Sequence, residues 1–176
     1  MLTVHDKTFV PFIDQPTLER RLDELAQQIN QDYQDKEPLL VVVLNGAFIF
    51  AADLMKRLTI PCRVTFIRVS SYQQMGSTGV MREILGLHEP LAGQDVILIE
   101  DIVDTGLTIQ EVRRQIAAQQ PESIAIAALL FKPAALKTEV DLAYIGFEIE
   151  NRFVLGYGLD YDGLGRNSPD ILVLKD

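Results

Sequence analysis

The sequence is short of three things, and each shortage limits what the protein can be. It has one cysteine, Cys62, so no internal disulfide can form and a reducing, cytoplasmic setting is expected. No apolar run approaches membrane-spanning length, and no basic segment leads into an apolar one after Met1, so we expect neither a membrane partner nor a signal peptide. Its 16 basic residues against 25 acidic ones give a net charge of −9, which argues against a nucleic-acid partner because phosphate binding needs a basic face.

The pattern of apolar residues predicts a single α/β domain over residues 1–176. About 48% of the residues are hydrophobic, enough for a substantial core, and no repeat or low-complexity tract divides the chain. Continuous apolar runs indicate buried parallel strands, alternation indicates further strands, and spacings of three and four indicate helices. The expected strands are 2–12, 39–44, 63–69, 80–87, 96–99, 124–131 and 141–148, and the expected helices are 16–34, 48–58 and one that carries Ile109, Val112 and Ile116.

The most informative stretch lies in the middle of the chain. The apolar residues 96–99 are followed by two adjacent acids, Glu100 and Asp101, then by Asp104 and by the small polar segment 105–108, before helical spacing begins. This order predicts a strand, an acidic turn, a loop and a helix. A parallel strand would deliver that turn to the carboxyl edge of the sheet, where open α/β sheets bind ligands.

The residue types in this turn favour a ligand that carries both a phosphate and a sugar. Thr105, Gly106 and Thr108 fall where the first helical amides are unpaired, which makes an anion site, and Gly106 would let the backbone approach the ligand closely. Carboxylates beside a phosphate would repel it, so they need another role. They can accept hydrogen bonds from sugar hydroxyls or hold a divalent cation. The alternative is an ordinary buried strand with a charged turn and a capped helix.

This stretch resembles the phosphoribosyl pyrophosphate (PRPP) signature of type I phosphoribosyltransferases, and most of the chain from about residue 39 fits the group that acts on hypoxanthine, or on hypoxanthine and guanine. The resemblance implies that Glu100 and Asp101 hold the ribose diol and that Asp104 is the catalytic residue, a general base or electrostatic partner at N7 of the purine. The PRPP-binding residues that it implies are Glu100, Asp101, Ile102, Val103, Asp104, Thr105, Gly106, Leu107 and Thr108.

Two loops outside this stretch are ambiguous from their residues alone. Asn45 and Gly46 follow the strand 39–44 and could form a plain turn, and Ser71 and Tyr72 could lie in a simple surface loop. The resemblance implies that Asn45 and Gly46 lie against the pyrophosphate, with a non-proline cis peptide before Asn45. It also implies that Ser71 and Tyr72 belong to a lid that excludes water from the reaction.

The purine site is expected from the last third of the chain. Lys132 ends the strand 124–131, and from that position alone we favour an ammonium group that reaches water rather than a ligand. Gly156 and Gly158 lack the third glycine of a dinucleotide fingerprint. In the family, the matching lysine donates to the 6-oxo group of the base. The resemblance further implies that Lys132, Arg152, Phe153, Val154 and Asp160 line the purine site, with Phe153 stacking on the base, and that Arg166 contacts the pyrophosphate.

The resemblance therefore implies a mostly parallel sheet flanked by helices, with a small hood built from the N- and C-terminal segments. It implies Mg²⁺ as the cofactor, held by Glu100, Asp101 and Asp160, PRPP and a 6-oxopurine as substrates, and a homo-oligomer, dimer or tetramer. Asn45 and Leu107 depart from the family, in which many members have lysines. A xanthine- or guanine-preferring enzyme and a non-catalytic PRPP sensor remain alternatives, whereas a phosphoacceptor receiver domain would carry its acids after the first strand.

Overall fold

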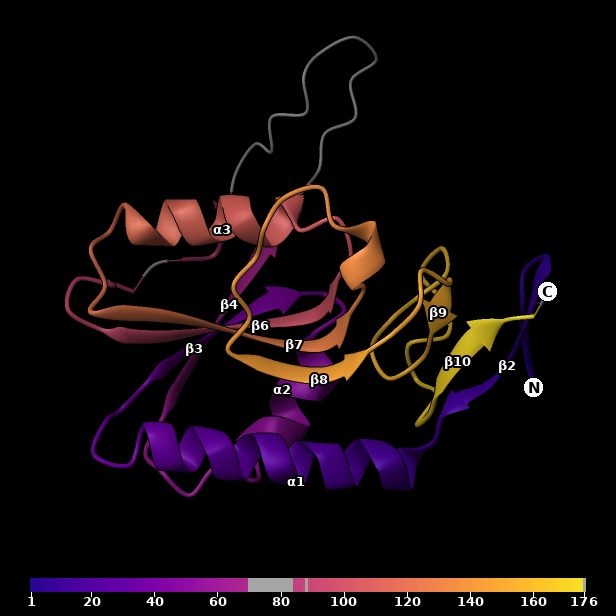
Figure 1. Ribbon diagram of the computed structural model, residues 1–176, viewed down its shortest axis with the longest axis horizontal. Helices are drawn as coiled ribbons and strands as arrows, with labels where there is room; N and C mark the ends of the chain where they lie inside the picture. Colours follow the sequence, from indigo (N-terminus) through magenta and orange to yellow (C-terminus); the bar gives the residue numbers. More distant parts are fainter. Residues whose placement is uncertain (70–83, 88, 176) are drawn as a thin grey trace, which may run out of the picture.

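The protein forms two sheets of very different size in the computed structural model, which describes residues 1–69, 84–87 and 89–175 (Figure 1). The larger sheet has six strands in the order β5-β4-β3-β6-β7-β8. All neighbouring pairs are parallel except β4 and β5. Its strands are β3 (Leu39–Leu44), β4 (Arg63–Val69), β5 (Ile84–Leu85), β6 (Asp95–Val103), β7 (Ser123–Phe131) and β8 (Tyr144–Glu148).

Helices cover both faces of this sheet, which explains why its central strands are continuously apolar. Helices α1 (Gln15–Asp32) and α2 (Phe48–Met55) lie on one face and α3 (Leu107–Ala117) lies on the other (Figure 1). Alternate residues of β3 pack on opposite faces of the sheet. Leu40 packs with the α1 and α2 residues, and Val41 packs with the α3 residues. The predicted α/β class is confirmed.

The smaller sheet forms the hood that was expected from the two ends of the chain. Its order is β1-β2-β10-β9, and all its pairs are antiparallel. The single edge strand expected over 2–12 is wrong, because the chain turns back at His5, whose φ is 51°, and the second strand becomes an interior one. The strands are β1 (Leu2–Val4), β2 (Lys7–Ile13), β9 (Val154–Leu155) and β10 (Ile171–Leu174).

Strand β6 is longer than the apolar run 96–99 predicts. It pairs with β7 as far as Val103 opposite Phe131, so Glu100 and Asp101 belong to the strand and only Asp104 lies in the turn. The acidic residues can continue the strand because backbone pairing with β7 does not depend on their side chains. Elsewhere α2 ends at Met55, earlier than expected, and a short 3-10 helix, η1 (Pro133–Ala135), follows β7.

Candidate active site

The predicted site residues gather at the carboxyl edge of the large sheet. This edge receives the loop after β3, the end of β6 and the residue after β7, as the topological rule for open α/β sheets requires. The hood segment 156–166 closes the same edge from the side, since Gly158 lies against the loop after β3. Residues from four separate parts of the chain therefore surround one space.

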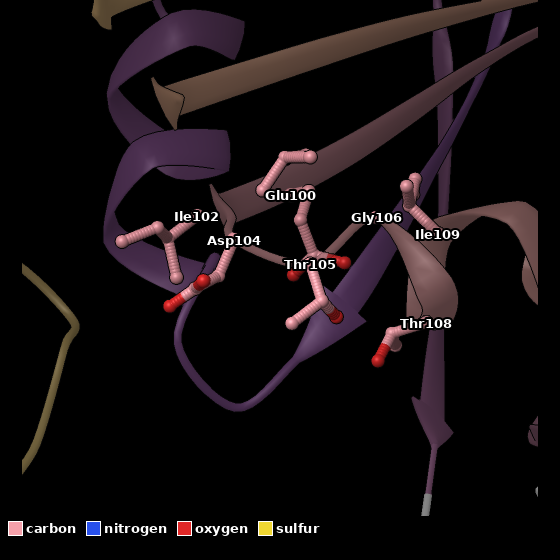
Figure 2. Close-up of a pocket in the computed structure, with 8 residues that line it drawn as sticks. Glu100, Ile102, Asp104, Thr105, Gly106, Thr108 and Ile109 are labelled. Atoms are coloured by element: carbon pink, nitrogen blue, oxygen red, sulfur yellow. The ribbon is translucent and has the colours of Figure 1, made fainter. Parts of the chain in front are cut away.

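The start of α3 has the form of an anion site. The helix begins after Gly106, whose φ is 79°, and within the described part of the chain no side chain caps it. Thr105 and Thr108 line a pocket here together with Glu100 and Asp104. Figure 2 shows the side chains of Glu100, Asp104, Thr105 and Thr108 around this pocket, at the end of β6 and the start of α3.

Glycine at position 106 is favoured both by its backbone conformation and by the close packing around it. A Cβ added at Gly106 would lie 2.6 Å from Cγ2 of Val140 and 3.2 Å from Cδ2 of Leu136. These atoms belong to the segment that follows η1. The positive φ and the close packing both favour glycine. Gly106 also lines the pocket with Thr105 and Thr108, so its expected role in admitting a ligand to the backbone stays a prediction.

Glu100 and Asp101 form a buried acidic pair. Glu100 is 7% exposed, and burial, reinforced by the neighbouring Asp101 carboxyl, raises its pKa well above the usual range. Burial also raises the pKa of Asp101, although its Oδ1 accepts a hydrogen bond from the Ile102 amide at 2.9 Å. The pair therefore favours a ligand that brings positive charge or hydrogen-bond donors.

Asp104 and Lys132 form an ion pair across the ends of β6 and β7. Nζ of Lys132 lies 3.1 Å from Oδ2 of Asp104, and the two side chains are 7% and 45% exposed, respectively. The ammonium group of Lys132 is thus buried against the carboxylate, and the preference for a water-exposed lysine was wrong. The backbone explains this, because the Lys132 amide donates to the Val103 carbonyl at 3.0 Å and holds the residue beside β6.

Gly46 and Gly158, where the loop after β3 meets the hood, are packed without room for a Cβ. A Cβ at Gly46 would lie 1.5 Å from Oδ2 of Asp101, and a Cβ at Gly158 would lie 2.1 Å from the Gly46 carbonyl oxygen. The predicted cis peptide is present between Leu44 and Asn45. Gly46 therefore lies against both Asp101 and the hood.

Arg166 completes this corner. Its Nη1 donates to the Gly158 carbonyl at 2.6 Å, and the Gly158 amide donates to the Arg166 carbonyl at 2.9 Å. Its Nη2 lies 2.7 Å from Oδ1 of Asp160, and its charge partly offsets the burial that raises the pKa of Asp101. Arg166 thus links Asp160 to Gly158, which lies against Gly46.

The comparisons with known proteins agree with this geometry. The model of the phosphoribosyl transferase domain matches residues 12–162. The chain belongs to the phosphoribosyltransferase family. It is 40% identical over 152 residues to the hypoxanthine-guanine phosphoribosyltransferase of Mycobacterium tuberculosis (82% of this chain, 75% of that one) and 34% identical over 178 residues to that of Aquifex aeolicus (100% of both). The hypoxanthine phosphoribosyltransferase of Trypanosoma cruzi, a mutant solved as a ternary substrates complex, has a TM-score of 0.89 and 33% identity, with 96% of each chain covered.

The family resemblance of the central stretch is therefore confirmed, and the protein is a phosphoribosyltransferase enzyme. Its described residues include no helix that is long and apolar enough to cross a membrane. Ser71 and Tyr72, the expected lid residues, lie outside the described residues. The roles of individual site residues stay predictions.

The adjacent carboxyl groups of Glu100 and Asp101 would suit a magnesium ion that is also bound by the substrate. Glu100 and Asp101 are adjacent, and burial raises both pKa values, so an added cation would stabilise their ionised forms. Asp160 stands apart, paired with Arg166. Within residues 1–69, 84–87 and 89–175 no group of three metal-binding side chains occurs. Two adjacent carboxylates fit Mg²⁺, because this ion usually takes one or two carboxylates plus substrate oxygens and water.

The expected purine-stacking residue has neighbours that the sequence did not indicate. Phe153 is 42% exposed, so it is not a core residue, and Nζ of Lys7 lies 5.3 Å from its ring centroid. Tyr161 meets Phe153 edge-on at 5.7 Å. Tyr161 could have been suspected from its place beside Asp160, but Lys7 belongs to a strand that carried no functional signal. Of the other expected purine residues, Val154 is buried in β9, and Arg152 donates to the Leu174 carbonyl.

Proposed function

We propose that this phosphoribosyltransferase acts in purine salvage. It would transfer the 5-phosphoribosyl group of PRPP to N9 of hypoxanthine, and also of guanine, giving IMP or GMP and pyrophosphate. The bond from C1′ of the ribose to the pyrophosphate oxygen breaks, the bond from C1′ to N9 forms, and the purine loses a proton. The names of the relatives support this choice of base.

The observation that carries the proposal is the pair formed by Lys132 and Asp104. An ammonium group can only donate hydrogen bonds, and this one is buried, so it matches a purine with an acceptor at position 6. The half-exposed carboxylate 3.1 Å away can accept the proton that the purine gives up. One buried donor and one accessible acceptor thus meet where the base would lie.

The other end of the site supports PRPP as the donor substrate. The 5′-phosphate would bind at the amides and hydroxyls of Thr105 to Thr108, and the ribose diol would donate to Glu100 and Asp101. The leaving pyrophosphate would lie against Asn45, Gly46 and Arg166. When bound by Glu100 and Asp101, and at a second position by Asp160, Mg²⁺ would offset the negative charge that develops on the pyrophosphate.

An assay with four bases tests this proposal. The protein is incubated with PRPP and Mg²⁺ and with hypoxanthine, guanine, xanthine or adenine in separate reactions, and both nucleotide and pyrophosphate are measured. We expect turnover with hypoxanthine and guanine. Turnover mainly with xanthine would establish a xanthine-preferring enzyme, and PRPP binding without turnover would establish a sensor. The cytoplasmic location and the dimer or tetramer stay predictions, and light scattering checks the second.

A further inference from the structure

Tyr157 lies at the centre of the most unusual backbone segment in the hood. It is flanked by Gly156 and Gly158, and the three consecutive φ angles are 98°, 48° and 102°. A tyrosine rarely adopts the left-handed conformation, so its surroundings must hold it there. Its side chain is buried, and its hydroxyl donates to Oδ2 of Asp53 at 2.6 Å.

The partner of Tyr157 comes from the other side of the site. Asp53 lies on α2, the helix that begins directly after the loop containing Asn45 and Gly46. Its Oδ1 also pairs with Nζ of Lys56 at 2.6 Å. Burial would raise the pKa of Asp53, but the hydrogen bonds from Lys56 and Tyr157 outweigh burial and lower it, so Asp53 accepts as a carboxylate. Hydrogen bonds to ionised acceptors are among the stronger ones.

Gly158, the residue after Tyr157, connects this hydrogen bond to the site. Gly158 lies so close to Gly46 that a Cβ would come within 2.1 Å of the Gly46 carbonyl oxygen. Gly158 also exchanges two hydrogen bonds with Arg166. The hydrogen bond between Tyr157 and Asp53 therefore spans the contact where the hood meets the loop after β3.

We propose that Tyr157 is a positioning residue, which, through its hydrogen bond to Asp53, holds Gly158 and Arg166 in register with Asn45 and Gly46 and so controls the affinity for the pyrophosphate end of PRPP. The identity of this ligand rests on the proposed function. The base should be affected less, because Lys132 and Asp104 are held by β6 and β7. The hood residues Phe153 and Val154 are held by their pairing with β10 rather than by Tyr157.

Tyr157→Phe tests this proposal because it removes one hydroxyl and keeps the ring. We expect the KM for PRPP to rise roughly 10-fold, as for the loss of a hydrogen bond to a charged group, with the KM for hypoxanthine changed by less than about twofold. Tyr144→Phe is the matched control. The Tyr144 hydroxyl donates to Oδ2 of Asp32 at 2.7 Å and is equally buried, but β8 begins there, at the opposite edge of the sheet. This control should lose stability without changing either KM.

Two variants of Asp53 separate positioning from general loosening. Asp53→Asn keeps an oxygen acceptor and should retain most of the affinity for PRPP, whereas Asp53→Ala should match Tyr157→Phe. The double variant Tyr157→Phe/Asp53→Ala should be no weaker than either single one, because both remove the same interaction. Equal changes in the two KM values, or the same change in Tyr144→Phe, would overturn the proposal.

Calorimetry separates failure of this inference from failure of the proposed function. If the unmodified protein makes no nucleotide, the proposed function fails, but binding of pyrophosphate in the presence of Mg²⁺ can still be measured. Tyr157→Phe should then weaken pyrophosphate binding by the same factor of roughly 10, and Tyr144→Phe should not. No binding of pyrophosphate, or equal binding by all three proteins, would contradict the inference.

Discussion

The two ends of strand β6 carry acidic residues in opposite circumstances. At its start, Asp95 accepts hydrogen bonds from Nζ of Lys36 at 2.9 Å and from the Ser123 hydroxyl. Burial would raise the pKa of Asp95, but these two partners outweigh it and lower the pKa. At the other end, burial raises the pKa of both Glu100 and Asp101. One strand thus stabilises the fold at its amino end and carries an electrostatic cost at its carboxyl end.

The opposite directions of these pKa shifts distinguish acids that stabilise the fold from acids that are placed to bind a ligand. A carboxylate that contributes to stability has its donors within the chain, as Asp95 has. A buried carboxyl with a raised pKa persists only where something outside the chain makes use of it, and such groups gather at functional sites. The comparison predicts that changes at the carboxyl end affect activity and that changes at the amino end affect stability.

Removal of the divalent ion should have the largest effect. In the proposed function Glu100 and Asp101 would share a cation with the substrate, and Asn45 and Leu107 offer no lysine to replace it. Excess chelator should abolish turnover, and Mg²⁺ or Mn²⁺ should restore it, whereas the melting temperature of the ligand-free protein should hardly change. Full turnover in chelator would remove the metal from the mechanism.

Asp104→Asn should have the next largest effect. The substitution keeps the shape of the side chain but removes the charge that faces the base. We expect kcat to fall by roughly 10²-fold or more, the usual scale of acid–base catalysis, with little change in the KM for PRPP. Steady-state kinetics at saturating hypoxanthine measure this. A variant with near-normal kcat would show that Asp104 only anchors Lys132.

Local patterns were enough to predict the main strands of the large sheet, whereas the roles of the loops that carry Asn45 and Tyr72 were implied only by the family resemblance. The apolar runs of β3 and β7 are continuous because both faces of the sheet are covered, and the motif from Glu100 to Thr108 is specific enough to identify the family. The limits of β6 were less predictable, because pairing with β7 extends the strand through residues that a turn would also accept.

Contacts between distant parts of the chain could not be predicted. The orientation of Lys132 depends on Asp104, and the requirement for glycine at position 106 depends on Val140, neither of which follows from neighbouring residues. The hairpin of the hood was mistaken for one strand because its turn at His5 and Asp6 has no glycine or proline to mark it. Its Lys7 could be placed beside Phe153 only once β2 was known to lie inside the hood.

Lys132→Met should affect the choice of base more than it affects turnover in general. It keeps much of the length of the side chain but removes the donor for a 6-oxo group. A buried 6-oxo group without its hydrogen-bond donor costs about 1–3 kcal/mol of binding free energy. We therefore expect kcat/KM for hypoxanthine to fall by roughly 10- to 100-fold, while kcat/KM for adenine changes far less. Both bases are measured at saturating PRPP. An unchanged ratio of kcat/KM for hypoxanthine to kcat/KM for adenine would show that backbone groups near Val154, and not Lys132, select the base.

The smallest effects should be on stability, and their signs should be opposite at the two ends of β6. Asp95→Ala removes a paired carboxylate and should lower the free energy of unfolding by about 1 kcal/mol, because its partner Lys36 is half-exposed. Glu100→Gln removes a carboxyl whose ionised form is disfavoured by burial and by Asp101, so it should raise the free energy of unfolding at neutral pH while it lowers activity. Its amide keeps the size of the side chain.

The pH dependence of the free energy of unfolding tests the sign of both effects independently. The native state holds the Glu100 proton above the ordinary pKa of 4.5, so the native state binds more protons than the unfolded state and stability falls as the pH rises through that range. For Asp95 the unfolded state binds more protons, so its contribution is present above its ordinary pKa of 3.8 and is lost as the pH falls below that value. Denaturant unfolding of both variants in chelator, from about pH 2 to pH 8, should therefore show Glu100→Gln gaining on the unmodified protein toward high pH and Asp95→Ala approaching it only below pH 3.8. The same slope for both variants would mean that the two ends of the strand do not differ in the way that their partners indicate.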